Sequence, residues 1–185
     1  IGSNLIYGQT RTTIVAWSGV QANGTATSGT TANTSQTLAT AGGTSAITFN
    51  AGSCTSSLSA TGWDAGNGTK NWVLGVNSTG FTSLQVTFTQ RSSNTGPRDF
   101  KLQYSTNNGS NWSDAGSTQS LTTTCATISN FALPSACNDV STLRLRWIMT
   151  SNTGVNSSPV AVGGTSQITA ITVNGLPSTP TTTSL

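Results

Sequence analysis

Acid–base and nucleophilic chemistry have few candidate side chains in this sequence. Its 185 residues include no His and no Glu, so the side-chain carboxylates are Asp64, Asp99, Asp114 and Asp139. Glycoside hydrolysis uses two carboxylates at a defined separation. Asp99 and Asp114 flank one predicted hairpin, but each stands beside turn-forming residues. Ser and Thr are abundant, yet a hydroxyl nucleophile needs a neighbouring base, which His usually provides. We therefore expect no catalytic residues, no cofactor and no enzymatic activity.

Metal-binding patterns are equally sparse. No two cysteines have the CxxC spacing of a zinc site, and His is absent. Calcium binds loop carboxylates, amides and main-chain carbonyl groups. The candidate pairs are Asp64 with Asn67 and Asn138 with Asp139, but neither has EF-hand spacing. Both pairs also fit Asx turns, in which the side chain bonds to its own main chain, so we predict no metal site.

The cysteines are odd in number: Cys54, Cys125 and Cys137. An odd count in a secreted chain leaves one thiol free or paired with another chain. Cys125 and Cys137 flank a short segment that can fold back on itself, so we predict a disulfide between them. Cys54–Cys125 is the rival pairing.

Carbohydrate binding is the small-ligand chemistry that the sequence supports best. Aromatic rings can stack on sugars, and Arg, Asn, Gln and Asp side chains can bind hydroxyl groups. The candidate ligand-binding residues are Trp63, Trp112, Lys101, Gln103, Arg144 and Arg146. The two Trp lie among turn residues and the other four on outward strand positions. The structural alternative is that the Trp rings cap the sandwich edges and the Arg stems cover apolar surface.

Strands must position these side chains, because apolar residues alternate with polar ones in several segments. The alternation is clearest at residues 84–89, 100–104 and 143–149. In the last segment, Leu, Leu, Trp and Met point inward, whereas Arg144, Arg146 and Ile148 point outward. Further strands are predicted at residues 12–17, 46–50, 71–76, 126–133 and 167–173. Asn-, Gly- and Pro-rich turns separate the segments, which predicts an all-β fold, a two-sheet antiparallel β-sandwich of jelly-roll type.

Composition excludes several other classes of protein. Only 6% of residues are charged, against roughly 25% in an average soluble domain. Disorder is not expected, because 34% of residues are hydrophobic and the net charge is only +3. No apolar run is long enough for a membrane span. The basic residues form no cluster, so nucleic acid is not an expected partner.

Four segments resemble the jelly-roll β-sandwich modules of large secreted or surface-anchored bacterial proteins. They are GWDAGNGTKNWVLGV (62–76), QRSSNTGPRDFKLQYSTNNGSNW (90–112), LPSACNDVSTLRLRWIMTSNTGVN (133–156) and GGTSQITAITVNG (163–175). The resemblance covers roughly residues 12 to 175 and implies an exported location and no catalytic residues. Such modules often carry an acidic pair before the last strand, where this chain has Thr169 and Ala170.

The chain organisation suggests a role in assembly or adhesion. Residues 1–11 are expected to form an N-terminal extension, residues 12–176 the sandwich, and residues 177–185 a Thr/Pro-rich tail or linker. A start at Ile1 rather than Met fits a secreted protein whose leader has been removed. Our first hypothesis is an extracellular, self-assembling surface or filament subunit, with Leu5, Ile6 and Tyr7 donated as a strand to the next copy. The alternative is a carbohydrate-binding or adhesion module of a larger secreted protein, with cell-surface or plant-type glycans as partners.

Overall fold

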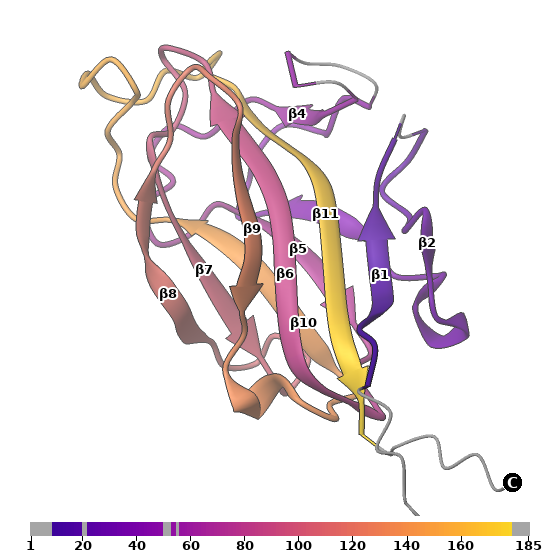
Figure 1. Ribbon diagram of the computed structural model, residues 1–185. Coiled ribbons are helices and arrows are strands. Elements are labelled where there is room, and N and C mark those ends of the chain that lie inside the picture. Colours follow the sequence, from indigo (N-terminus) through magenta and orange to yellow (C-terminus); the bar gives the residue numbers. More distant parts are fainter. Residues whose placement is uncertain (1–8, 20–21, 50–52, 55, 179–185) are drawn as a thin grey trace, which may run out of the picture.

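Two antiparallel sheets lie face to face in the computed structural model, which describes residues 9–19, 22–49, 53–54 and 56–178 (Figure 1). One sheet has the order β2 (Ser28–Gly29), β1 (Thr12–Trp17), β11 (Ser166–Pro177), β6 (Phe81–Ser92) and β9 (Ala126–Ala132), and β4 (Leu58–Ala60) also pairs with β11. The other has the order β3 (Leu38–Ala41), β5 (Asn71–Val76), β10 (Leu143–Met149), β7 (Asp99–Ser105) and β8 (Ser113–Ser120). Two 3-10 turns, η1 (Thr31–Asn33) and η2 (Ser135–Cys137), complete the described elements. The predicted β-sandwich is therefore confirmed.

Side-chain alternation along β10 shows how the sandwich forms. Leu143, Leu145, Trp147 and Met149 are each at most 1% exposed. The intervening Arg144 and Arg146 remain partly exposed on the opposite face of the strand. Since successive side chains of a strand point to opposite faces, this pattern fixes which face of the sheet meets the core. The predicted positions of both arginines and of these four inward residues are confirmed, whereas Ile148, predicted to point outward, is buried at 4% exposure.

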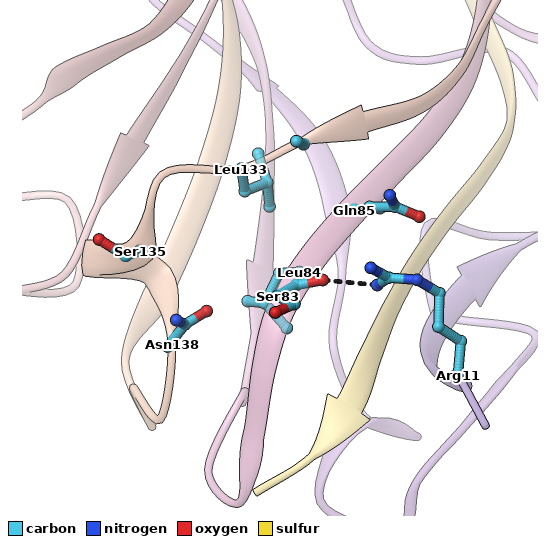
Figure 2. Close-up of a pocket in the computed structure, with 8 residues that line it drawn as sticks. Arg11, Ser83, Leu84, Gln85, Leu133, Ser135 and Asn138 are labelled. Carbon is cyan, nitrogen blue, oxygen red and sulfur yellow. Dashed lines mark hydrogen bonds between the residues drawn. The ribbon is translucent and has the colours of Figure 1, made fainter. Parts of the chain in front are cut away.

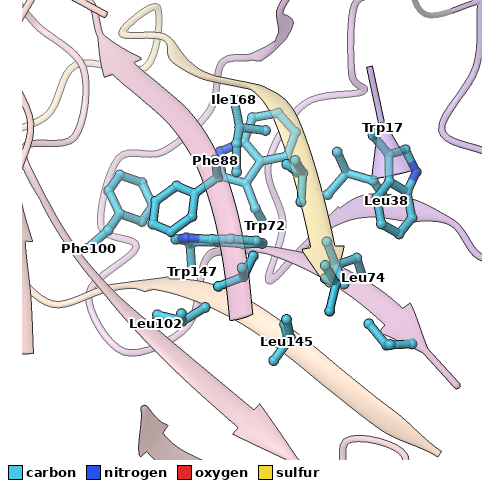
Figure 3. Packing of buried hydrophobic residues seen from close by; sticks show 14 of the residues in the cluster. Trp17, Leu38, Trp72, Leu74, Phe88, Phe100, Leu102, Leu145, Trp147 and Ile168 are labelled. Atoms are coloured by element: carbon cyan, nitrogen blue, oxygen red, sulfur yellow. The ribbon is translucent and has the colours of Figure 1, made fainter. Parts of the chain in front are cut away.

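Aromatic rings fill the space between the sheets (Figure 3). Phe88 of β6 meets Trp147 of β10 edge to face, with ring centroids 5.0 Å apart. Trp63, from the loop after β4, packs against both Trp72 and Phe100 with centroid separations of 5.6 Å. The edge-to-face pairs Phe88–Trp147 and Trp63–Phe100 each add about 0.5–1.5 kcal/mol to the burial of apolar area.

A bulge in β11, the last strand, changes which side chains point toward the core. Ile168 and Ile171 are both fully buried although they are three residues apart, which simple alternation forbids. The register with β6 shifts between Thr169 and Thr172. Ala170 takes a φ of +50° there. The extra residue of a bulge lets both Ile side chains reach the core.

The predicted Cys125–Cys137 disulfide is wrong. The bridge joins Cys54 to Cys125, and Cys137 is a buried free thiol. Cys125 and Cys137 stand before and after β9, whose seven residues span roughly 20 Å at about 3.3 Å each. Bridged Cα atoms must lie within about 7 Å, so an extended β9 keeps these two cysteines apart.

Other local expectations differ from the structure at polar or short elements. The segment predicted at 46–50 forms no strand in its described part, 46–49, and contributes only the bridge Thr48–Ser59. Strands β2, β3, β4 and β8 were not predicted. Leu5, Ile6 and Tyr7, the proposed donor segment, lie outside the described residues.

Candidate functional site

Six side chains make up the candidate site, which we call the polar face. They lie on the outward side of the five-stranded sheet, on β7, β8 and β10 and at the end of the β7–β8 hairpin loop: Lys101, Gln103, Trp112, Asp114, Arg144 and Arg146. Pairing brings them together, because Gln103 lies opposite both Arg146 of β10 and Asp114 of β8. Residues in register on one face of a sheet have adjacent side chains.

A chain of hydrogen bonds joins four of these side chains. Arg146 Nε donates to Gln103 Oε1 at 2.8 Å, and Gln103 Nε2 donates to Asp114 Oδ1 at 2.7 Å. The second carboxylate oxygen of Asp114 accepts from Lys101 Nζ at 2.9 Å. The Gln103 amide and the Lys101 ammonium hold the pKa of Asp114 below its usual value. The network therefore keeps Asp114 ionised and fixes the orientation of the Gln103 amide.

The β7–β8 hairpin loop holds the remaining contacts. Trp112 lies beneath the Arg146 guanidinium, whose Cζ is 4.1 Å from the ring centroid, in a cation–π arrangement. Arg144 Nε donates to Asn108 Oδ1 at 2.7 Å. Asn108 and Gly109 both have positive φ, at 57° and 90°. Asn and Gly tolerate this backbone, so the predicted turn residues place an acceptor over Arg144.

Among the aromatic residues that the structure describes, Trp112 is the one that neither belongs to the hydrophobic core nor packs against it. Trp17, Trp63, Trp72 and Trp147 are at most 1% exposed, and the described Phe and Tyr rings are either buried or packed against the core. Trp63, one of the predicted ligand-binding residues, therefore offers no exposed ring to a ligand. The turn that carries Trp63 folds over the end of the core. The Trp63 indole Nε1 donates to the Ala60 carbonyl at 2.8 Å.

The other carboxylates have structural partners. Asp64 lies 3.7 Å from the Lys70 ammonium, which also donates to the Gly62 and Asp64 carbonyls. Asp139 accepts from the Gly80 amide at 2.8 Å. No group of three or more His, Cys, Asp or Glu in the described chain is placed to hold a metal ion.

Asp99 is not available as a partner for Asp114 in hydrolysis, because it is only 6% exposed and fully engaged. Its carboxylate accepts from Arg98 Nε, Ser120 Oγ and Ser151 Oγ. Burial acts to raise the pKa of Asp99, but these hydrogen bonds and the Arg98 charge together lower it. The group ties β7, β8 and the segment after β10 together.

Replacing Asp99 by Asn should lower the free energy of unfolding at pH 7 by about 1–3 kcal/mol, since Arg98, Ser120 and Ser151 lose a charged acceptor that is itself buried. A lowered native pKa means that the carboxylate stabilises the fold above the ordinary Asp pKa of about 4. That contribution is lost as pH falls through the lowered native value. Urea denaturation at pH 7 and pH 2.5 should show that the difference in free energy of unfolding between the variant and the wild type is smaller at the lower pH. An equal difference between the two proteins at both pH values would contradict this role.

A recess also lies beside β6 on the other sheet (Figure 2). Its volume is about 290 Å³, at the lower limit of roughly 300–1,000 Å³ for small-molecule sites. Its one charged side chain, Arg11, already donates to the Ser83 carbonyl. It holds none of the predicted ligand-binding residues.

No protein-family model matches this sequence, and no curated protein matches it. Among solved structures, the carbohydrate-binding module CBM4 superposes with a TM-score of 0.52 at 13% identity, over 76% of this chain and 86% of that chain. The N-terminal cellulose-binding domain of Cellulomonas fimi β-1,4-glucanase C gives 0.44 at 14% identity, over 75% and 88%. A xylan-binding domain from CBM22 gives 0.48 at 9%, over 77% and 88%. The likeness to CBM4 shows a shared β-sandwich fold, in agreement with the fold that the sequence resemblance implies.

Proposed function

We propose that this chain is a non-catalytic carbohydrate-binding module and that the polar face is its binding surface. The supporting observation is that five of the six predicted ligand-binding residues, all except Trp63, gather on one open sheet face. The face presents amide, carboxylate and guanidinium groups, which match the donors and acceptors of sugar hydroxyl groups. CBM4, which shares the fold, is a carbohydrate-binding module.

An open sheet face is better suited to binding a polymer than to binding a small molecule. The polar face crosses β10, β7 and β8 in register, so a glycan chain can lie across several strands. Its side chains are anchored to one another, which reduces the conformational entropy lost on binding. The rival hypothesis, a homopolymer built by strand exchange, depends on a segment outside the described residues and has no support from the comparisons.

Gln103→Ala should weaken polysaccharide binding about tenfold or more, because it removes the amide that orients both Arg146 and Asp114. Trp112→Ala should have a similar effect by removing the ring beneath Arg146. Affinity electrophoresis against a panel of soluble polysaccharides, followed by calorimetry with any that bind, would measure these losses.

Gln85→Ala is the matched control, since Gln85 is a partly exposed Gln on β6 of the opposite sheet. Binding should survive this substitution. A ligand affinity that falls equally in Gln85→Ala and Gln103→Ala would place the binding surface elsewhere. Retention of the wild-type unfolding transition by Gln103→Ala would separate lost binding from lost folding.

We also propose that the module works outside the cell. The Cys54–Cys125 disulfide supports this location, because such bridges persist in oxidising compartments. Among the described residues, no helix has both the length and the apolar character needed to cross a membrane. Recovery of the chain with Cys54 and Cys125 reduced, from its native source under thiol-trapping conditions, would contradict an extracellular location.

A further inference from the structure

The charges of the polar face do not balance. It carries three cations, Lys101, Arg144 and Arg146, and one carboxylate, Asp114, which is paired with Lys101 at 2.9 Å. The sequence has only three other side-chain carboxylates and no Glu. Asp64 lies beside Lys70, Asp99 beside Arg98, and Asp139 accepts from a main-chain amide. No side-chain carboxylate of the chain is therefore left for Arg144 and Arg146.

Both arginines are held with their terminal nitrogens uncommitted. Each uses Nε to donate to a side-chain amide oxygen, Arg144 to Asn108 and Arg146 to Gln103. In the described part of the chain, neither has a hydrogen bond from Nη1 or Nη2. These two nitrogens form the fork that binds both oxygens of a carboxylate. Anchoring at Nε leaves this fork oriented before any ligand arrives.

Spacing on β10 presents the two forks together. Arg144 and Arg146 are two residues apart on one strand, so their Cα atoms are about 6.6 Å apart and their side chains share a face. An acidic polymer carries one acid group after another and can engage both forks. The Arg146 guanidinium also covers one side of the Trp112 ring. Contact through charge is thereby favoured over stacking of a neutral sugar on that side.

The opposite sheet lacks this concentration of charge. Where β6 and β11 lie in register, the outward pairs are Gln85–Asn174, Thr87–Thr172 and Thr89–Thr169, all neutral. Arg91 lies beyond these pairs, opposite Gln167, and Arg11 precedes β1. The two adjacent, carboxylate-free guanidinium groups are thus a feature of the polar face.

We propose that the polar face selects polysaccharides that carry carboxylate groups, such as uronic acid polymers, over neutral ones, with Arg144 and Arg146 each binding one acid group. This inference rests on the proposed function, because it specifies the ligand of the same surface. A sulfated polysaccharide would offer related anionic chemistry, so the experiment includes it as a separate arm.

The experiment measures binding of the full chain to polygalacturonate, to fully methyl-esterified pectin, to dextran sulfate and to neutral dextran. Polygalacturonate should bind at least tenfold more tightly than its esterified counterpart, which has the same backbone without the charge. Affinity should fall as salt rises, since the partly exposed guanidinium groups are screened. Tighter binding of dextran sulfate than of polygalacturonate would overturn the carboxylate assignment.

Four variants separate specific recognition from net charge. Arg144→Gln/Arg146→Gln should lose polygalacturonate binding ten- to a hundredfold. Arg144→Lys/Arg146→Lys keeps both charges but loses the forks, and should also weaken binding. Arg11→Gln removes one charge outside the polar face and should bind like the wild type, whereas Arg144→Gln alone should not. An equal loss in Arg11→Gln and Arg144→Gln would overturn the proposal.

The two proposals can fail separately. Equal binding of neutral and acidic polysaccharides, with loss in Gln103→Ala, would reject the acidic ligand and keep the carbohydrate-binding module. Binding to none of these polymers would reject the acidic ligand, and binding to no member of the wider panel would reject both proposals.

Discussion

Removal of the Cys54–Cys125 disulfide by Cys54→Ser/Cys125→Ser is expected to lower the free energy of unfolding by about 4 kcal/mol. The bridge spans 71 residues of sequence. In the chain-entropy description, closing a loop of this length removes roughly 4 kcal/mol of conformational freedom from the unfolded state. The disulfide also lies within the sandwich, since it joins Cys54, which precedes β4, to Cys125, which directly precedes β9. Urea denaturation followed by circular dichroism would measure the loss.

The single variants provide an internal control. Cys54→Ser and Cys125→Ser destroy the same bridge, so each should lose nearly as much as the double variant, and the two effects should not add. Reduction of the disulfide in the wild type should shift its unfolding transition to the same urea concentration as that of the double variant. Additive single effects, or a bridge mapped to Cys125 and Cys137 by mass spectrometry, would contradict the observed pairing.

Cys137 should behave differently from the bridged cysteines. It is fully buried, and burial raises the pKa of its thiol to about 12. Because the thiolate is the reactive form, the native protein should resist alkylation at this position. The thiol packs as an apolar side chain in the core cluster.

Sequence patterns predicted the strands that bury one complete face. Strands β1, β5 and β10 match the predicted residue ranges, because their apolar side chains alternate or run continuously against the core. Strand β8 was missed because SDAGSTQS has no apolar alternation. It is an edge strand defined by its pairing with β7, and pairing depends on residues distant in the sequence.

In the candidate site, too, local sequence predicted some residues, whereas the position of others depends on contacts between distant segments. The outward positions of Arg144 and Arg146 follow from period two within one strand, so local sequence was sufficient. Asp114 was interpreted as a turn residue, because its contact with Gln103 exists only through the β7–β8 register. Trp63 was misplaced since turn-forming neighbours do not show whether a loop folds over the core.

The disulfide error had a signal in the sequence. The prediction of a strand at 126–133 already placed an extended segment between Cys125 and Cys137. An extended segment and a disulfide joining its two ends exclude each other on length alone. Applying that test would have favoured Cys54–Cys125, the pairing that the structure shows.

Trp147→Ala is expected to lower the free energy of unfolding by about 3–5 kcal/mol, the usual range for a large aromatic residue truncated in a core. Trp147 is 1% exposed and packs edge to face on Phe88 of the facing sheet. The cavity would therefore open between the two sheets, where neither can relax independently (Figure 3). Denaturation monitored by circular dichroism avoids the loss of indole fluorescence.

A matched pair of Phe substitutions separates packing from hydrogen bonding. The Trp72 indole Nε1 donates to Ser166 Oγ at 3.0 Å, and Ser166 is fully buried. The Trp147 Nε1 is buried without a hydrogen-bond partner in the described part of the chain. Both replacements remove similar ring volume, but Trp72→Phe also leaves the Ser166 hydroxyl without its donor. Trp72→Phe should therefore cost about 1 kcal/mol or more beyond Trp147→Phe, and equal costs would show that the indole–Ser166 hydrogen bond contributes nothing to holding the two sheets together.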